Sequence, residues 1–321
     1  MQKKEILQKV DKIVSKVLLK FSAEKGLLIT VLIHRLYGNL GNLNLSSFIR
    51  PKYTTFSDLR FFIEYFKNLG YTFVSPQDII NRLDPKENFV MITFDDGYYN
   101  NILSLPLLKK YEVPAVFFPS INHILQNKCF WWDVLYRERK KQGFSEKTII
   151  REENFLKVKK TRQIERYLVK KFGKNSFKPK NDFDRPFTLD ELKEFSKERL
   201  VNIGNHTLNH AILTNYSLNE IKDQIFLSQA RLKEFTGTKP IIISYPNGNY
   251  SEDIICIAKE ADLKLGITVN LKNNRLPLNF RKNDHFKISR FIVEKRDYFP
   301  VYRTSRNLSY FIEKIKSFKL K

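Results

Sequence analysis

The sequence predicts an α/β fold with a mainly parallel sheet. Short apolar runs recur along the 321 residues with helical patterns between them, which is typical of β/α units. Polar side chains that can bind a metal or move a proton follow several of these runs directly. In parallel α/β barrels such residues gather at the C-terminal ends of the strands, because the loops there converge over one mouth.

The predicted strands and helices alternate in a regular order. Seven apolar runs are expected to be strands: 27–34, 89–94, 114–119, 200–204, 241–245, 265–269 and 288–293. Thr188 with Glu191 and Ser217 with Glu220 have the S/T-x-x-E spacing of a capping box, in which a hydroxyl and a carboxylate satisfy free N–H groups. Helices are therefore predicted at about 189–198 and 218–235, with others at about 57–68 and from Ser251.

Composition limits the classes of function. The chain is 42% apolar, enough to fill a sizeable core, and a formal net charge of +23 favours anionic partners such as glycans, nucleic acid or phospholipid. The two cysteines, Cys129 and Cys256, are too few for a disulfide scaffold or a multi-cysteine zinc site, which indicates a reducing compartment. Specific nucleic-acid recognition is not expected, because the basic residues are spread out and no reading element is present.

The ends of the chain differ from its centre. Residues 1–25 are predicted to form a basic amphipathic helix, which either packs on the domain or lies on an anionic membrane surface. Residues 26–295 would form the main domain and 296–321 a helical tail. The apolar stretch 26–34 is too short to span a bilayer and too late for a secretory signal, so a cytoplasmic protein is expected, with peripheral contact at the inner membrane face as the hypothesis if the helix 1–25 lies on the membrane.

A basic insertion at about 125–187 interrupts the β/α rhythm. Between Arg137 and Lys180 there are 16 Lys and Arg against 5 Asp and Glu, a net +11. The segment is either a solvated helical excursion or an anion-binding lid. Its aromatic start, 130–132, would pack the insertion on the barrel or offer a face on which a sugar can stack.

Two motifs at predicted strand ends carry the chemistry. Asp95 and Asp96 follow one strand, and His206 and His210 follow another at i and i+4 spacing, where a helical turn would let both imidazoles reach one ion. Two histidines and one carboxylate leave open positions for water and a substrate carbonyl. The second aspartate would then take a proton, so the pattern favours metal-assisted attack on a carbonyl.

With these motifs the chain resembles the polysaccharide deacetylases of the NodB-homology type, carbohydrate esterase family four. The resemblance rests on TFDDG at 93–97, HTLNH at 206–210, the long helix that follows, and YPNG at 245–248. It runs from about Val31 to Val293, with 125–187 as a weakly matching insertion. The paired motifs are specific for the superfamily but not for a substrate.

The resemblance implies a distorted seven-stranded β/α barrel, similar to a TIM barrel, around a divalent metal, usually zinc. Asp96, His206 and His210 would be the metal ligands, and Asp95 the general base. The metal would bind the acetamide carbonyl, and acetate and a free amine would leave.

The resemblance also implies residues around the metal. A backbone N–H of one turn would hold the oxyanion, and that turn consists of Tyr245, Pro246, Asn247 and Gly248. Tyr98 would line the mouth, and Thr207 would position the second histidine motif.

The sequence departs from the family pattern in its third and last motifs. Ser244 and Asn247 stand where many members have Arg and Tyr, and Arg290 of the last strand is the expected substitute for the Arg that orients the catalytic Asp. The late general-acid histidine is not recognisable. His34 is the candidate acid, with a buried, hydrogen-bonded histidine as the alternative. The remaining histidines are expected to be structural or surface groups: His123 and His285.

The leading hypothesis is a metal-dependent hydrolase that removes the N-acetyl group from an amino sugar in a cell-envelope glycan. A precursor linked through phosphate to a lipid or a nucleotide is the favoured substrate, because a protein without an export signal would meet its substrate in the cytoplasm or at the inner membrane face. The negative charge of such a precursor also suits the basic chain. The alternatives are a catalytically silent glycan- or membrane-binding protein and a metal-independent amidase.

Overall fold

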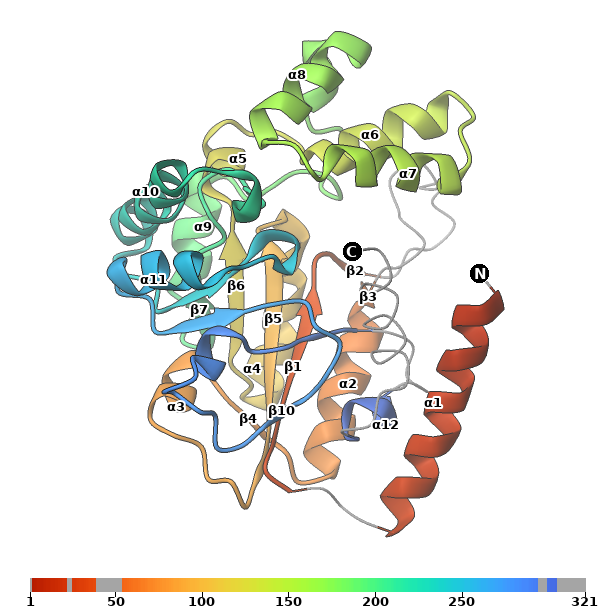
Figure 1. Cartoon of the computed structure of the whole chain (residues 1–321), viewed down its shortest axis with the longest axis vertical. Helices are drawn as coiled ribbons and strands as arrows, with labels where there is room; N and C mark the ends of the chain where they lie inside the picture. The colour runs from red at the N-terminus through yellow and green to blue at the C-terminus, as the bar shows by residue number, and fades with distance from the viewer. Residues whose placement is uncertain (1, 22–24, 39–53, 294–298, 305–321) are drawn as a thin grey trace.

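The computed structural model describes the chain except for residues 1, 22–24, 39–53, 294–298 and 305–321 (Figure 1). The described helices are α1 (Gln2–Phe21), α2 (Phe56–Asn68), α3 (Pro76–Ile80), α4 (Leu105–Tyr111), α5 (Ile121–Leu125), α6 (Trp131–Lys141), α7 (Glu146–Leu156), α8 (Thr161–Phe172), α9 (Leu189–Ser196), α10 (Leu218–Thr236), α11 (Glu252–Glu260) and α12 (Phe299–Tyr302). The described strands are β1 (Leu27–Ile33), β2 (Leu36–Tyr37), β3 (Thr54–Thr55), β4 (Thr72–Phe73), β5 (Asn88–Asp96), β6 (Ala115–Pro119), β7 (Val201–Ile203), β8 (Ile242–Ser244), β9 (Leu265–Ile267), β10 (Asn274–Arg275) and β11 (Phe291–Ile292).

The central sheet is mostly parallel and has seven strands. Its main path runs β10–β1–β5–β6–β7, with β11 also paired to β1 and β4 to β5. Only the pairing of β10 with β1 is antiparallel among the described strands of this sheet. The molecule is therefore the α/β fold that the sequence predicts, and each predicted apolar run overlaps one strand, of which β5 extends beyond its run at both ends.

Closure of the sheet into a barrel depends on single bridges. β8 and β9 pair with each other in a separate two-stranded sheet. Asn205, just after β7, bridges Ile243 of β8, and Ile267 of β9 bridges Ile288, shortly before β11. No continuous ladder joins these edges within the described residues, so a closed seven-stranded barrel stays a prediction.

The predicted helices are present, with their caps. The hydroxyl of Thr188 accepts from the Glu191 N–H while the Glu191 carboxylate accepts from the Thr188 N–H, and Ser217 with Glu220 begins α10. α10 ends at Gly237, which adopts the left-handed conformation that glycine tolerates best. The helices flank the sheet on both sides (Figure 1).

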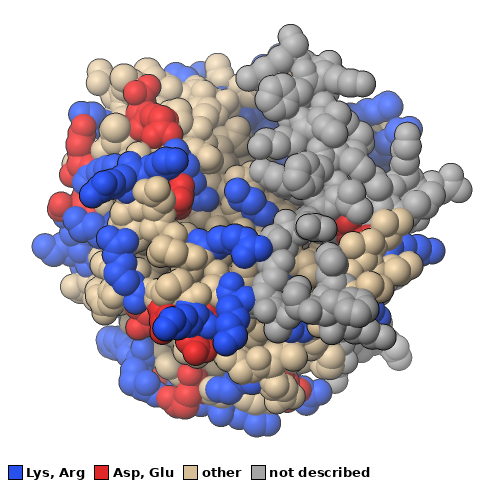
Figure 2. Space-filling view, turned by 60° about the horizontal axis from the view of Figure 1, so that its bottom comes forward, with Lys and Arg blue, Asp and Glu red and all other residues tan. Residues whose placement is uncertain are grey.

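Basic side chains are distributed widely over the surface. Figure 2 shows Lys and Arg across much of the visible face, with fewer Asp and Glu between them. The net charge of +23 is therefore not confined to one element, which agrees with the spread along the sequence.

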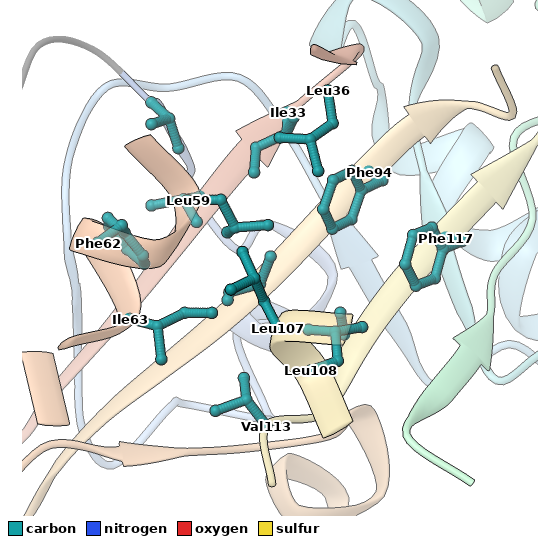
Figure 3. Packing of buried hydrophobic residues seen from close by; sticks show 14 of the residues in the cluster. Ile33, Leu36, Leu59, Phe62, Ile63, Phe94, Leu107, Leu108, Val113 and Phe117 are labelled. Carbon is teal, nitrogen blue, oxygen red and sulfur yellow. The ribbon is translucent and has the colours of Figure 1, made fainter. Parts of the chain in front are cut away.

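The largest apolar cluster lies between the sheet and the helices α2 and α4 (Figure 3). Leu59, Phe62 and Ile63 of α2 pack toward β1, while Phe94 and Phe117 stack between neighbouring strands with ring centroids 4.6 Å apart. All seven residues of β1 are buried, as expected for a strand covered on both faces. This core makes the sheet a rigid support for the loops at its carboxyl end.

The insertion is helical and lies at the end of the molecule where β5 and β6 finish (Figure 1). α6, α7 and α8 share a small apolar cluster of their own, which includes Val134, Leu156 and Leu168. The helical character predicted for about 125–187 is thus confirmed. Of the predicted tail, 296–321, most lies outside the described residues.

Candidate metal and catalytic site

The ends of β5 and β7 bring the two predicted motifs together. Asp95 and Asp96 are the last residues of β5, and His206 and His210 lie in the loop after β7. The prediction of a helical turn for the histidine pair is wrong. The segment is a turn in which Thr207 has φ 61° and His210 φ 49°. Its irregular backbone still places the two imidazole rings 4.8 Å apart.

Three side chains offer one ligand atom each to a common point. Atoms of Asp96, His206 and His210 lie within 4.8 Å of one another, and this set is the only such group of His, Cys, Asp and Glu among the described residues. The Nε2 atoms of His206 and His210 lie 3.4 and 3.3 Å from Asp96 Oδ1. Both Asp96 oxygens and His206 Nε2 are buried, and no hydrogen bond from the described part of the chain satisfies them. Buried polar atoms normally have partners, so this donor set fits a cation.

The second nitrogen of His206 fixes which atom faces the ligand set. His206 Nδ1 donates to the carbonyl oxygen of Ser244 at 2.8 Å. Nε2 is then the nitrogen with a free lone pair, as in metal-binding histidines oriented by a backbone carbonyl. The Thr207 hydroxyl accepts from the Ala211 N–H at 2.8 Å and so holds the turn between the two histidines.

Backbone strain concentrates at this site. Asp96 has φ 76°, a left-handed conformation that is uncommon for a residue other than glycine, and Asn247 has φ 59°. Gly97 follows with φ 85°, and a Cβ there would lie 2.8 Å from Pro119 Cα. Strained residues persist only where the surrounding structure holds them, and they cluster at functional sites. The bend at Asp96–Gly97 turns the carboxylate toward the histidines.

The site keeps its carboxylates ionised. Burial would raise the pKa of Asp96, but the adjacent His206 and His210 bring it well below its usual value. Burial lowers the pKa of His206, yet Asp95 and Asp96 together raise it above the ordinary value. His210 has a lowered pKa because burial dominates there. Negative charge is thus concentrated where a cation would bind.

Arg290, directly before β11, binds the other aspartate. Its NH1 and NH2 groups each donate to one oxygen of Asp95, both at 2.7 Å, and it is fully buried. The Ser244 hydroxyl donates to Asp95 Oδ2 at 3.0 Å, and Arg290 also donates to Thr93 Oγ1 at 2.9 Å. Burial would raise the pKa of Asp95, but Arg290 holds it below the usual range. Arg290 therefore contacts the aspartate that the arginine of the third motif, absent from this chain, is expected to orient.

The remaining predicted residues surround this centre. His34 is exposed just after β1, near enough for its charge to contribute to the lowered pKa of Asp95 and Asp96. In the YPNG turn the Tyr245 N–H donates to the Ile267 carbonyl oxygen and the Gly248 N–H to that of Tyr245, and proline has no N–H. In the described part of the chain the Asn247 N–H has no backbone acceptor, so it is the amide of this turn that can face a substrate oxygen.

Two predicted substrate contacts lie deeper than expected. Tyr98 is buried, and its hydroxyl donates to Asp133 Oδ2 at 2.6 Å and accepts from Trp132 Nε1 at 3.0 Å. It therefore supports the wall of the site and does not line an open mouth. Tyr245 is also buried, with its hydroxyl directed to the Phe286 carbonyl oxygen at 3.2 Å.

The start of the insertion forms part of the site. The Trp132 ring lies 4.5 Å from that of His210, and Trp132 is half-buried. Asp133 forms a buried ion pair with Arg35, which lies next to His34. Arg35 and Asp133 are not among the predicted site residues, because nothing in the spacing of two positions so far apart in the sequence predicts their contact. The only feature of the sequence that indicated a contact between the insertion and the site was the aromatic run 130–132.

Comparison with known proteins gives the family. A family model described as polysaccharide deacetylase matches residues 82–266, more than half of the chain. The chain belongs to the polysaccharide deacetylase family. The matched range of this deacetylase-family chain includes Asp95, Asp96, His206 and His210 but leaves out His34 and Arg290.

Individual relatives are distant. YxkH of Bacillus subtilis, named as a polysaccharide deacetylase, is 22% identical over 207 residues, which cover 62% of this chain and 52% of YxkH. The chain thus spans about half the length of this curated relative.

Solved structures share the fold. The Streptococcus pyogenes deacetylase PplD, determined with acetate, aligns with a TM-score of 0.56 at 18% identity over 84% of this chain and 92% of its own. IcaB from Ammonifex degensii aligns with a TM-score of 0.56 at 17% identity over 87% and 96%. At such low sequence identities, these comparisons show only that the two solved structures share the fold of this chain.

The two remaining histidines of this deacetylase-family chain are buried and lie outside the ligand set. His123 stacks on Phe130 with ring centroids 4.0 Å apart, and burial lowers its pKa well below the usual value. His285 stacks on Phe280 at 4.1 Å, and its pKa is lowered to about 4, mainly by burial. Both were expected to be structural or surface groups, and both are packed against aromatic rings.

Proposed function

We propose that this protein is a metal-dependent hydrolase that removes the N-acetyl group from an amino sugar of a cell-envelope glycan or its phosphate-linked precursor. One observation carries the proposal. Asp96, His206 and the partly buried His210 present ligand atoms to one point beside the ionised Asp95, and the described chain leaves both Asp96 oxygens and His206 Nε2 unsatisfied. Membership of the polysaccharide deacetylase family supports the reaction class.

A divalent metal, for which zinc suits two histidines and a carboxylate, supplies Lewis acidity that polarises a carbonyl and activates water. Asp96, His206 and His210 would hold it. Asp95 accepts the proton of the attacking water, and Arg290 keeps both its oxygens in place. The Asn247 N–H donates to the developing oxyanion. His34, exposed at the rim, gives a proton to the leaving amine.

The charge of the chain supports an anionic substrate. Polyprenyl diphosphates and nucleotides carry negative charge, which a protein of net +23 attracts over several ångströms. We therefore propose a phosphate-linked amino sugar met at the cytoplasmic face of the membrane, in preference to mature neutral polysaccharide.

The deciding experiment measures metal content together with acetate release from a panel of N-acetylhexosamine substrates. The wild type should contain one zinc per chain and release acetate. His206→Ala combined with His210→Ala should lose both, while His285→Ala, a buried histidine outside the ligand set, should keep both. Metal-bound protein that hydrolyses no N-acetyl sugar would instead favour the silent glycan-binding alternative, and metal-free wild type would overturn the proposal.

A further inference from the structure

Large apolar side chains are exposed on the outward side of the insertion. On α7 and the turn after it, Ile150 is 54% exposed, Phe155 59% and Val158 70%. Val158 is the most exposed large apolar residue of the described chain. We call this surface the α7 face and include in it the exposed cations Lys147 and Arg151.

The α7 face lies on the side of α7 opposite to the one that packs against the other helices of the insertion. Ile149, Glu153 and Leu156 are buried, and they belong to the inner side of the same helix. From the start of α7 to Val158 the exposed positions are 146, 147, 148, 150, 151, 154, 155 and 158, which carry Glu, Lys, Thr, Ile, Arg, Asn, Phe and Val, so Glu146 at the first position is the single acid among them. The outer side of α7 is therefore mixed apolar and cationic.

The cations of the face are not neutralised by the protein. Neither Lys147 nor Arg151 forms an ion pair in the part of the chain that the structure describes. By contrast, two of the nearby acids are already paired, Glu152 with Arg139 and Glu153 with Lys157, and the exposed Glu146 alone cannot balance both cations. Part of the excess of positive charge in the insertion is thus left on this surface.

α1 repeats the pattern at a separate place in the fold. Its polar Asp11 and Ser15 are buried, and the Ser15 hydroxyl lies 2.9 Å from that of Thr304. Ile13 and Val17 point outward with 63% and 48% exposure, next to the exposed Lys16. A helix of a soluble protein normally buries its apolar side. Of the two alternatives predicted for this helix, packing on the domain does not account for Ile13 and Val17.

We propose that the α7 face binds the surface of an anionic phospholipid bilayer, with α1 as a second contact. Apolar side chains flanked by Lys and Arg are what a helix lying in the interface requires, because the apolar groups enter the acyl boundary while the cations meet phosphate. A neutral protein partner would not match the unpaired cations. None of the described helices combines the length and the apolar character of a membrane span. The contact that we propose is peripheral.

Membrane binding by the α7 face does not require the proposed hydrolysis, but it would place the hydrolytic site close to the membrane. α6, which belongs to the same apolar cluster as α7, begins beside His210. Docking through α7 therefore holds the wall of the site at the lipid surface, where a lipid-linked sugar is found.

The test is co-sedimentation of the full chain with vesicles of phosphatidylcholine alone or with phosphatidylglycerol. Wild type should bind the anionic vesicles, and high salt should weaken the binding because it screens the charges. Ile150→Gln, Phe155→Gln and Val158→Gln together should weaken it about tenfold or more, since the apolar insertion is lost. Lys147→Glu with Arg151→Glu should do the same. Leu218→Gln with Leu227→Gln, which changes exposed apolar residues of α10, should leave binding unchanged.

Three results would overturn the proposal. They are no preference for anionic vesicles in the wild type, equal loss in the α10 control, and a dimer in lipid-free solution that the triple glutamine variant converts to a monomer. The last would assign the α7 face to a second copy of the chain. Acetate release from a water-soluble substrate should be equal in wild type and triple variant, so failure of membrane binding and failure of the hydrolase proposal are distinguishable.

Discussion

At the scale of single residues, the contact between Arg290 and Asp95 defines the electrostatics of the site. The guanidinium neutralises one aspartate, while the other aspartate is left to the two histidines. The two adjacent carboxylates thus have different surroundings and different expected roles. Arg290, directly before β11, does this although the third motif carries Ser244 where many family members are expected to carry an arginine.

Arg290→Met should abolish most activity and destabilise the protein. Removing the guanidinium leaves Asp95 buried without its charge partner, which costs about 3–5 kcal/mol of unfolding free energy. Acetate release should fall about a hundredfold or more, because an aspartate that is displaced or protonated cannot act as the base. Ser244→Ala is the matched control, since it removes one hydrogen bond to Asp95 and one from Arg290 but leaves their ion pair, and it should cost about 1–2 kcal/mol. Equal effects of the two changes in denaturant titration and kinetics would contradict the role of Arg290.

Zinc affinity of the metal-free protein should fall as the pH decreases. The pKa of Asp96 is lowered, so this ligand stays ionised in the neutral range. For His206, burial is outweighed by Asp95 and Asp96 and the pKa is raised, so a proton occupies this ligand up to a higher pH and must leave before zinc binds. Affinity should therefore decrease by up to about tenfold for each pH unit below neutrality. Competition with a fluorescent chelator measures it, and an affinity that is flat from about pH 7.5 to about pH 5.5 would show that no proton is displaced from His206.

At the scale of elements, the insertion is attached to the deacetylase-like body through buried polar contacts at both its ends. At its start, Asp133 pairs with Arg35 and accepts from Tyr98. At its end, the Phe187 N–H donates to the Gly97 carbonyl oxygen at 3.0 Å, and the Tyr99 N–H donates to that of Arg185 at 3.1 Å. Both ends therefore contact the segment that directly follows the metal-ligand candidate Asp96.

Asp133→Asn should loosen this attachment. The substitution removes the carboxylate charge that Asp133 offers to the buried Arg35, and we expect a loss of about 3–5 kcal/mol together with reduced acetate release. Glu194→Gln makes the same kind of change in an exposed pair with Lys197 and should stay within about 1 kcal/mol of wild type. Thermal unfolding followed by circular dichroism compares them. Indistinguishable melting temperatures for the two variants would mean that the Arg35–Asp133 pair does not anchor the insertion.

At the scale of the whole molecule, the excess positive charge should act on substrate binding more than on the chemical step. Fields from a net charge of +23 steer anionic ligands toward the surface, while the buried Asp95 network is shielded from solvent ions.

Raising the salt concentration should therefore weaken the binding of phosphate-linked substrates. Between about 0.1 M and about 1 M salt the Debye length falls from about 10 Å to about 3 Å. We expect KM for a phosphate-linked N-acetyl sugar to rise several-fold while kcat changes little. A neutral N-acetylhexosamine oligosaccharide should show a constant KM in the same steady-state assay. Parallel changes for both substrates would indicate that charge plays no part in recognition.

Local patterns in the sequence were enough to predict the fold class, seven of the strands, the capped helices and the identities of the ligand candidates, but not the two-residue strands β2, β3, β4 and β10. These patterns are apolar runs of strand length, hydroxyl and carboxylate at cap spacing, and Asp and His directly after strands. The spacing of His206 and His210 did not predict the backbone conformation between them, because residues at i and i+4 can lie close together in an irregular loop as well as in a helix.

Which distant groups meet depends instead on the assembled fold. Arg290 and Asp95 are 195 positions apart, and Asp133 reaches Tyr98 across 35 positions, so their contacts depend on strand register and on the path of the insertion. The outward apolar sides of α1 and α7 were also undecided, since periodicity shows that a helix has two sides but not which side the body covers. Whether a side chain is buried depends on the other segments that pack against it, so the sequence of one segment does not determine it.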